Sequence, residues 1–402
     1  MEHAWCRLRL FFFGGGFTLK LRITAGVFVS FCFTVLVMAE PKLATLEAEL
    51  NARVPDLLKI HKVPGVAIGV IENGSVTAQF YYGLSDKLNS TPVTHQTSFN
   101  VGSVSKTLTA WAVMRLVESG KVNLDSPIQN YLSLWQLPAS KYEVSGVTVR
   151  RLLNHTSGIG QWAVPQFEPG EQIPSLAAVL SSGQNHQGEK AEMIFEPGTE
   201  WRYSGGGYTM LQLMIEEVSG DTFSEFMQRE IFAPLGMNNS GFTLTEDLLS
   251  ASATAYDHQG KETPLARFSA TGAAGLHTTV GDLAKFASAS LSSANGGAPG
   301  RGIITPETVA MMTSNGVSAA SSDPTVVNRN YGLGYFVSGG IPSFVGHGGD
   351  NRGWHARFIL YPDTNNGFVA LTNSSNGFPL AETINCLMTN QLANIPAKKV
   401  CD

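Results

Sequence analysis

The chain has 402 residues, 43% of them hydrophobic and 15% charged, and its formal net charge is −5 at pH 7. This is the composition of a globular protein with a large core or two lobes, and it excludes collagen-like, disordered and multi-span membrane proteins. Because the acidic balance comes without any cluster of Lys and Arg, it argues against nucleic acid as a partner.

The first 39 residues differ from the rest of the chain. They hold four basic side chains and one acidic side chain, then an apolar run over residues 23–37, and they end in Val37-Met38-Ala39. This order is typical of a secretory signal peptide, cleaved here after Ala39. The apolar run is short for a membrane span, which needs about 20 residues, but a retained N-terminal anchor is the alternative. We therefore expect an exported protein, periplasmic or secreted, with membrane attachment by residues 1–39 as the second reading.

Helix and strand signals follow one another after this segment. Apolar residues at helical spacing predict an amphipathic helix over residues 41–61. Two β-rich runs, 65–71 and 76–82, are joined through Asn73-Gly74, which predicts a hairpin. The stretch 106–117 is apolar nearly all round, so we expect a helix buried between layers.

The remaining elements complete a two-lobe fold. Helices are predicted over 211–218, 223–230 and 282–291, a surface loop over 181–190, and strands over 331–337, 355–361 and 368–372. Strands at both ends of the chain predict an α+β fold: one antiparallel sheet flanked by helices, with an inserted, mainly helical lobe. Within one domain over residues 40–402, we expect an α/β lobe of about 40–119 and 271–402 and a helical lobe of about 120–270.

Two cysteines, Cys386 and Cys401, lie outside the N-terminal segment. In an oxidising compartment they could pair and hold the C-terminal tail, and two free thiols are the equal alternative. No group of Cys and His has metal-ligand spacing, so we predict no metal site.

Ser103 is followed three residues later by Lys106 at the start of the predicted helix. Three residues make nearly one helical turn, so both side chains project to the same side. A serine hydroxyl becomes a nucleophile when a base takes its proton, and a lysine whose pKa is lowered by burial can be that base. By itself, however, the pair fits a helix cap with a surface lysine better.

Two later segments combine glycines with a polar side chain. Tyr203 precedes Gly205-Gly206-Gly207, and a tyrosine hydroxyl near two cations can shuttle protons. His347 is flanked by glycines on a predicted strand edge, which can lie flat against a substrate and offer N–H groups. Taken singly, a helix-entry turn with a core tyrosine and a bulged strand with a surface histidine explain these segments.

In this order and at these separations, the three features resemble the serine β-lactamase and penicillin-binding-protein superfamily. Within it they are similar to the branch of class C β-lactamases, D,D-peptidases and esterases. That branch carries Ser-x-x-Lys on a helix, Tyr-x-Asn or a variant on a loop, and Lys-Thr-Gly or His-x-Gly on a strand. Here Ser103/Lys106, Tyr203 and His347-Gly348-Gly349 match the pattern. The resemblance covers about residues 45–375 and extends to four further stretches, 120–128, 149–159, 195–198 and 234–237.

The resemblance implies a serine hydrolase that needs no cofactor and acts on a small molecule or a peptide. Ser103 would form an acyl-enzyme that water then hydrolyses, while Lys106 and Tyr203 carry the protons. The oxyanion hole would be the backbone N–H groups of Ser103 and Asp350.

Other residues would bind substrate or support the site. The resemblance assigns substrate binding to His347-Gly348-Gly349 and to Asp350. Arg352 could hold a substrate carboxylate by a bidentate pair, and a surface salt bridge explains it equally well. His155 is expected to be structural and to tie down the loop after Leu153, rather than to act as a base.

Two departures from the family pattern bear on the substrate. Gly205 stands where many relatives have an asparagine that recognises the acyl amide, and His347 replaces the usual lysine with a side chain that is charged only part of the time. Both favour a hydrolase of small esters, amides or D-amino-acid peptides. The alternatives are a class C-type β-lactamase, or a catalytically silent relative used as a scaffold or for binding cell-wall peptides.

Overall fold

The computed structural model describes residues 42–160, 163–182, 190–314, 316–319, 330–395 and 399–401. Its contacts divide the chain into a unit of residues 1–51 and a unit of residues 52–402, and the boundary falls inside helix α2 (Lys42–His61). The predicted signal peptide, residues 1–39, lies outside the described residues. Across the described ranges, no helix has both the length and the apolar composition that crossing a bilayer requires.

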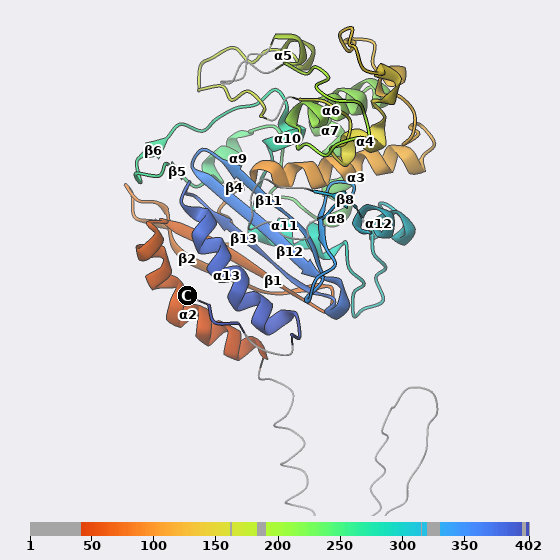
Figure 1. The fold of residues 1–402 in the computed structure, drawn as a ribbon. Helices are drawn as coiled ribbons and strands as arrows, with labels where there is room; N and C mark the ends of the chain where they lie inside the picture. Colours follow the sequence, from red (N-terminus) through yellow and green to blue (C-terminus); the bar gives the residue numbers. More distant parts are fainter. Residues whose placement is uncertain are drawn as a thin grey trace, which may run out of the picture. The chain divides into compact units, whose positions relative to one another are not determined.

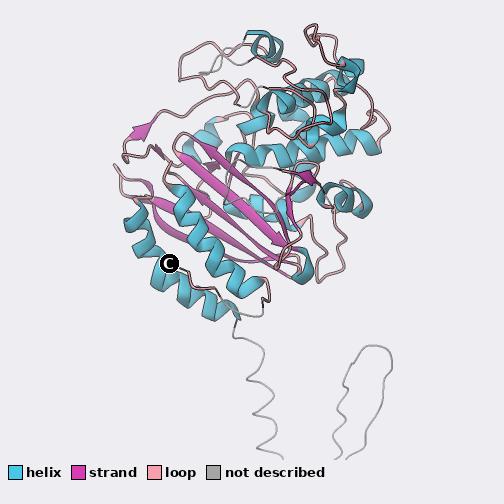
Figure 2. Ribbon diagram, in the orientation of Figure 1, coloured by secondary structure: helices cyan, strands magenta, loops and turns pink. Residues whose placement is uncertain are grey.

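The larger unit is built on an antiparallel sheet, drawn in magenta in Figure 2. Its strands in the described residues are β1 (Gly65–Glu72), β2 (Ser75–Asp86), β3 (Thr91–Pro92), β8 (Val317–Ser318), β9 (Asn330–Tyr331), β10 (Phe336–Ser338), β11 (Phe344–Asn351), β12 (Trp354–Tyr361) and β13 (Asn366–Thr372). They lie in the order β3-β2-β1-β13-β12-β11-β10-β9-β8. The N- and C-terminal strands meet where β1 pairs with β13, so the predicted α+β fold with a single antiparallel sheet is confirmed.

The N-terminal hairpin follows from its turn residues. Asn73 and Gly74 both adopt positive φ, at 51° and 67°, as a tight hairpin turn between β1 and β2 requires. Strand β1 is buried along nearly its whole length, because it lies between two neighbouring strands and has helices on the sheet's faces.

Helices cover both faces of the sheet. Helix α13 (Gly377–Leu392) lies in front of it in Figure 1, against β12 and β13. Helix α11 (Val280–Ser288) packs against β1, β2 and β13, where Gly69 allows close approach, because a Cβ there would lie 3.2 Å from the Ala284 Cβ. Alternate residues of the central strands therefore contribute to two separate apolar layers.

The helices between β3 and β8 are α3 (Ser105–Glu118), α4 (Val149–Leu153), α5 (Leu176–Ser182), α6 (Gly205–Ser219), α7 (Phe223–Met227), α8 (Ala233–Leu235), α9 (Glu246–Ala251), α10 (Thr271–Ala274), α11 and α12 (Pro306–Thr313). Short strands β4 (Phe99–Asn100) and β7 (His277–Thr278) pair with each other, as do β5 (Ala255–Tyr256) and β6 (Glu262–Thr263). Helix α3 matches the predicted buried helix. The division into two lobes stays a prediction.

Two differences between the structure and the sequence-based elements have clear local causes. The single strand expected over 331–337 is two short strands, β9 and β10, separated by a turn in which the Gly332 N–H donates to the Tyr335 carbonyl. Helix α6 begins at Gly205 rather than at 211, because the Ser204 hydroxyl caps it and Gly207 lets it approach Leu152 of α4. Part of the predicted loop 181–190 lies outside the described residues.

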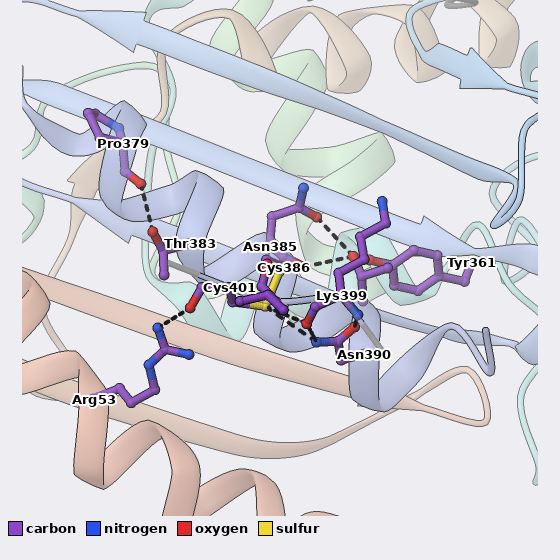
Figure 3. The surroundings of a disulfide bond; sticks show 11 residues. Arg53, Tyr361, Pro379, Thr383, Asn385, Cys386, Asn390, Lys399 and Cys401 are labelled. Atoms are coloured by element: carbon purple, nitrogen blue, oxygen red, sulfur yellow. Dashed lines mark hydrogen bonds between the residues drawn. A yellow bond between two sulfur atoms is a disulfide. The ribbon is translucent and has the colours of Figure 1, made fainter. Parts of the chain in front are cut away.

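The two C-terminal cysteines are paired. Cys386 on α13 forms a disulfide with Cys401, across a sequence separation of 15 (Figure 3). Asn390, also on α13, makes two hydrogen bonds to the C-terminal tail, residues 399–401. Its amide donates to the Lys399 carbonyl at 2.8 Å, and its side-chain oxygen accepts the Lys399 N–H at 2.7 Å. Of the two alternatives left open by the sequence, the structure has the disulfide.

Candidate active site

Ser103 and Lys106 lie at the entry to the buried helix α3. Ser103 belongs to a short 3-10 turn, Gly102–Val104, that leads directly into α3. The Lys106 ammonium lies 3.2 Å from the Ser103 hydroxyl oxygen and donates to the Ala273 carbonyl at 2.8 Å. The lysine is only 3% exposed, and this burial lowers its pKa to about 7. A large fraction of Lys106 is therefore neutral near pH 7, and a neutral amine beside a serine can take its proton.

Tyr203 lies on the other side of the same amine. Its ring centre is 4.8 Å from the Lys106 nitrogen, and its buried hydroxyl has no hydrogen-bond partner among the residues that the structure describes. Burial raises the pKa of Tyr203 well above its ordinary value, and the nearby Ser103 opposes part of that rise. The phenol is thus held in its protonated form, ready to give a proton rather than to act as a standing base.

His155 supports Tyr203 from behind. The two ring centres are 4.3 Å apart, and Tyr208, Tyr331 and Trp201 surround the imidazole. Its Nδ1 accepts the Ser204 N–H at 3.1 Å, which ties the loop after α4 to the start of α6. Burial holds the pKa of His155 well below its ordinary value. This is the geometry expected of a structural residue.

Strand β11 lies beside β10 over only part of its length. Strand β10 pairs with residues 344–346 of β11, and within the described ranges no strand pairs with His347-Gly348-Gly349 and Asp350 on that side. The main chain of these residues is therefore open toward Ser103, as a backbone that binds a substrate must be.

The backbone of β11 comes into close contact with the turn that carries Ser103. A Cβ on Gly102 would lie 2.7 Å from the Asp350 nitrogen, and a Cβ on Gly349 would lie 2.1 Å from the Val101 carbonyl oxygen and 2.6 Å from the Ser103 nitrogen. Only glycines permit this approach. It brings together the two N–H groups, of Ser103 and Asp350, that the sequence comparison assigned to an oxyanion hole.

An asparagine pair holds this approach in place. The Asn351 amide donates to the Asn100 side-chain oxygen at 2.6 Å and to the Ala274 carbonyl at 2.9 Å. The same Asn100 oxygen accepts the Gly102 N–H at 3.0 Å. One side-chain oxygen thus links the end of β11 to the residue before the serine. Sequence reasoning missed both asparagines, because their partners lie far away along the chain.

The structure differs from the sequence-based expectation in the charge of His347, which was expected to be partly positive. Its Nε2 is 2.9 Å from the Tyr331 hydroxyl and its Nδ1 is 2.6 Å from the Gly348 carbonyl, so both ring nitrogens have protein partners. Burial lowers the pKa of His347 to about 3. The ring is therefore neutral at neutral pH, and it offers no positive charge to a substrate carboxylate.

Arg352 points to a carboxylate of the protein. Its guanidinium lies 3.1 Å from a Glu168 oxygen, and both side chains are about half exposed. This is the surface salt bridge that was one of the two readings of Arg352. The residue does not line the cavity next to Ser103.

That cavity has a volume of about 430 Å³. The lining residues are Ser103, Trp201, Tyr203, Ala319, Phe336, Phe344, Gly346, His347, Gly348, Gly349, Asp350, His355, Arg357, Phe358, Ile359 and Phe378. A serine hydroxyl, a phenol and a glycine-rich strand therefore line one largely apolar space. In the described parts of the chain, no group of three or more His, Cys, Asp or Glu could hold a metal ion.

Comparison with known proteins shows the family of this chain. A model of the Beta-lactamase family matches residues 50–390, which is most of the chain. The chain belongs to the Beta-lactamase family. Members of this family with the same fold include serine hydrolases such as esterases, and proteins of the penicillin-binding type.

The curated relatives of this chain include both an esterase and a protein named for penicillin binding. Esterase EstB of Burkholderia gladioli is 27% identical over 50% of this chain and 53% of its own length. PbpX of Bacillus subtilis (strain 168), named for penicillin binding, is 29% identical over 53% of this chain and 50% of its own length. The chain thus spans about half the length of these curated relatives.

A solved structure extends the likeness over more of the chain. The octameric penicillin-binding protein homologue from Pyrococcus abyssi superposes with a TM-score of 0.67 at 25% identity, covering 89% of this chain and 80% of that one. The β-lactamase/transpeptidase-like fold is therefore shown.

Proposed function

We propose that this protein is a serine hydrolase that cleaves small esters, amides or D-amino-acid peptides through an acyl-enzyme on Ser103. The observation that carries the proposal is the buried Lys106 amine, 3.2 Å from the Ser103 hydroxyl and with a pKa lowered to about 7. A catalytically silent scaffold has no need for a deprotonatable lysine buried beside a serine. The chain's membership of a family rich in serine hydrolases supports the same assignment.

The reaction would proceed in two stages. Neutral Lys106 takes the Ser103 proton as the hydroxyl oxygen attacks the substrate carbonyl, and the N–H groups of Ser103 and Asp350 stabilise the resulting oxyanion. Tyr203 gives a proton to the leaving group, and the proton on Lys106 restores the phenol. In the second stage a water molecule attacks the acyl-enzyme carbonyl and gives up a proton to the same groups. Ser103 regains a proton as the acid is released.

Two features favour neutral esters over β-lactams as substrates. The asparagine that recognises an acyl amide in many relatives is Gly205 here, and Gly205 is the first residue of α6. The side chains expected to bind a substrate carboxylate are otherwise engaged, since His347 is neutral and Arg352 pairs with Glu168. A neutral ester requires neither an asparagine for an acyl amide nor a cation for a carboxylate.

The test compares wild type with Ser103→Ala, using a fluorophosphonate probe, p-nitrophenyl acetate and nitrocefin. We expect covalent labelling and ester turnover in the wild type, loss of both in the variant, and little nitrocefin turnover. Rapid nitrocefin hydrolysis would identify a β-lactamase instead. Absence of labelling in a folded wild-type protein would contradict the hydrolase proposal.

We also propose that the protein is exported. The predicted signal peptide and the Cys386–Cys401 disulfide support this placement, because disulfides persist in oxidising compartments. Expression of the full chain, followed by fractionation and N-terminal sequencing of the product, tests it. An N-terminus at residue 40 outside the cytoplasm is expected, and an uncleaved protein in the membrane fraction would favour the anchor.

A further inference from the structure

The cavity beside Ser103 contains one side-chain carboxylate among its described lining residues, that of Asp350. The Asp350 side chain is 68% exposed, so it is a charged group in contact with solvent in the cavity. Its charge also reaches the reaction centre, since it contributes to raising the pKa of Tyr203. The backbone N–H of Asp350 belongs to the proposed oxyanion hole. The same residue would therefore bind the reacting carbonyl and place a carboxylate near it.

His355 fixes the position of this carboxylate. Asp350 and His355 face each other across the β11–β12 register, and the imidazole Nδ1 is hydrogen-bonded to an Asp350 oxygen. His355 is 1% exposed, and its Nε2 is buried without a partner in the described structure. Because Nε2 has no partner among the described residues, the Nδ1 hydrogen bond is the polar contact by which this buried ring holds the Asp350 carboxylate in place.

Among the described lining residues, no Lys or Arg is free to offset the charge of Asp350. Arg357 is the one Lys or Arg among the described lining residues, and it is already ion-paired with Glu382 and stacked on the Phe378 ring at 5.5 Å. His347 is neutral because of its burial. Lys106 adds no charge in the neutral form that activates Ser103.

The rest of the lining is suited to apolar groups. Trp201, Phe336, Phe344 and Phe378 contribute aromatic side chains, and Ile359 adds an aliphatic one. An apolar substituent would be removed from water by these walls, whereas an anionic one would meet Asp350 without a counter-ion.

We propose that Asp350 selects substrates by charge, so that the site accepts neutral or cationic apolar esters and amides and rejects those that carry a carboxylate. This inference rests on the proposed serine-hydrolase function. It narrows the substrate range, because β-lactams and peptides ending in a free carboxylate belong to the rejected class, whereas peptides with a free amino group do not.

Three acetate esters whose meta substituents differ in charge provide the test: 3-acetoxybenzoate, its methyl ester and 3-acetoxy-N,N,N-trimethylanilinium. All three form the same acetyl-enzyme, and their intrinsic differences in leaving-group reactivity cancel when wild type is compared with a variant, so changes in the ratios of kcat/KM report on recognition of the charged group. Wild type should hydrolyse the anionic ester least efficiently. In Asp350→Asn, the anionic-to-neutral ratio of kcat/KM should rise about five- to tenfold, and the cationic-to-neutral ratio should fall by a similar factor, the size of one charge acting over roughly 6–8 Å at intermediate dielectric.

Using ratios cancels any general loss of turnover that the substitution causes at the oxyanion hole. Asp363→Asn is the matched control, because it removes one carboxylate beyond the opposite end of β12 and should leave both ratios unchanged. If Asp350→Asn does not fold, Asp350→Ser and the salt dependence of the wild-type ratio replace it. Raising the salt concentration should increase the relative turnover of the anionic ester.

The outcomes separate the two proposals. Ser103-dependent hydrolysis of the neutral ester, with ratios that stay within twofold in Asp350→Asn and at high salt, would overturn the charge selection and leave the hydrolase standing. Wild-type preference for the anionic ester would do the same. Failure of all three esters, together with no fluorophosphonate labelling, would overturn both.

Discussion

At the scale of single residues, the chemistry of the site depends on burial. Lys106 has its ammonium beside Ser103, Tyr203 and the Ala273 carbonyl, with almost no access to water. Removing a charge from water costs free energy, so the neutral amine is favoured and its pKa falls to about 7. An exposed lysine at the same spacing would stay protonated and could not activate the serine.

The first prediction concerns the pH dependence of turnover. Because only neutral Lys106 can take the Ser103 proton, kcat/KM for a neutral ester should rise with pH and reach half its plateau near pH 7. Lys106→Arg keeps the positive charge at all accessible pH values and should lower kcat/KM by about 10²–10⁴-fold. Steady-state kinetics between pH 5 and 9 give both results, and a flat profile over that range would rule out Lys106 as the base.

At the scale of elements, the site forms where a strand edge meets a helix entry. Neither β11 nor the turn before α3 has the complete proposed oxyanion hole, because each would contribute one N–H group. The two segments can approach since Gly102 and Gly349 have no side chains, and Asn351 joins them through Asn100. The glycines therefore set how closely the strand and the turn approach, and the asparagines set how firmly they are held together.

Gly349→Ala tests the contact itself. The new methyl group would lie 2.1 Å from the Val101 carbonyl oxygen, so the strand and the turn must separate. We expect kcat/KM to fall by about 10²–10³-fold, as when an oxyanion-hole donor is removed. Gly339→Ala is the control, because a Cβ there meets nothing within 4 Å. Circular dichroism shows whether both variants fold, and a folded Gly349→Ala enzyme with normal kinetics would contradict the assignment.

Asn351→Ala tests the link. Loss of its bonds to Asn100 and Ala274 should loosen the oxyanion hole without altering the cavity walls. We therefore expect kcat to fall about tenfold while KM changes less than about threefold, since a displaced oxyanion-hole N–H weakens mainly the binding of the transition state. Asn366→Ala, which removes a similar bond to the Leu392 carbonyl away from the site, should affect stability and leave kcat unchanged.

At the scale of the whole molecule, the sheet joins strands that are about 300 residues apart in the sequence. Strand β1 pairs with β13, so residues near 70 and residues near 370 belong to one structure, and α13 then covers β12 and β13. The tail after α13 returns along that helix and is fastened by Cys386–Cys401 and by Asn390. The guanidinium of Arg53 also donates to the Cys401 carbonyl (Figure 3).

Removing the disulfide should therefore lower stability more than activity. With a separation of 15 residues between the cysteines, Cys386→Ser should reduce the free energy of unfolding by about 3 kcal/mol. Urea unfolding with and without reductant measures this difference, and reduction should destabilise only the wild type. Ester turnover at 25 °C should be nearly unchanged, because neither Cys386 nor Cys401 is among the described residues that line the cavity. Equal stability of oxidised and reduced wild type would show that the bond has no such role.

The sequence by itself determined the features that depend on local spacing. The helical turn between Ser103 and Lys106 and the Asn73-Gly74 hairpin are both patterns within a few residues, and the structure has each of them. The family resemblance also followed from short motifs in a fixed order, and the family comparison confirms it.

Only the tertiary structure decided which distant groups meet. The Ala273 carbonyl that binds Lys106 lies 167 positions away, and Glu168, which holds Arg352, lies 184 positions away. His347 is neutral because Tyr331 and the surrounding aromatic side chains exclude water from it. The charge state of a side chain and its choice of partner depend on the distances between atoms and on the local dielectric. Both are set only when the fold brings distant segments, such as β1 and β13, together.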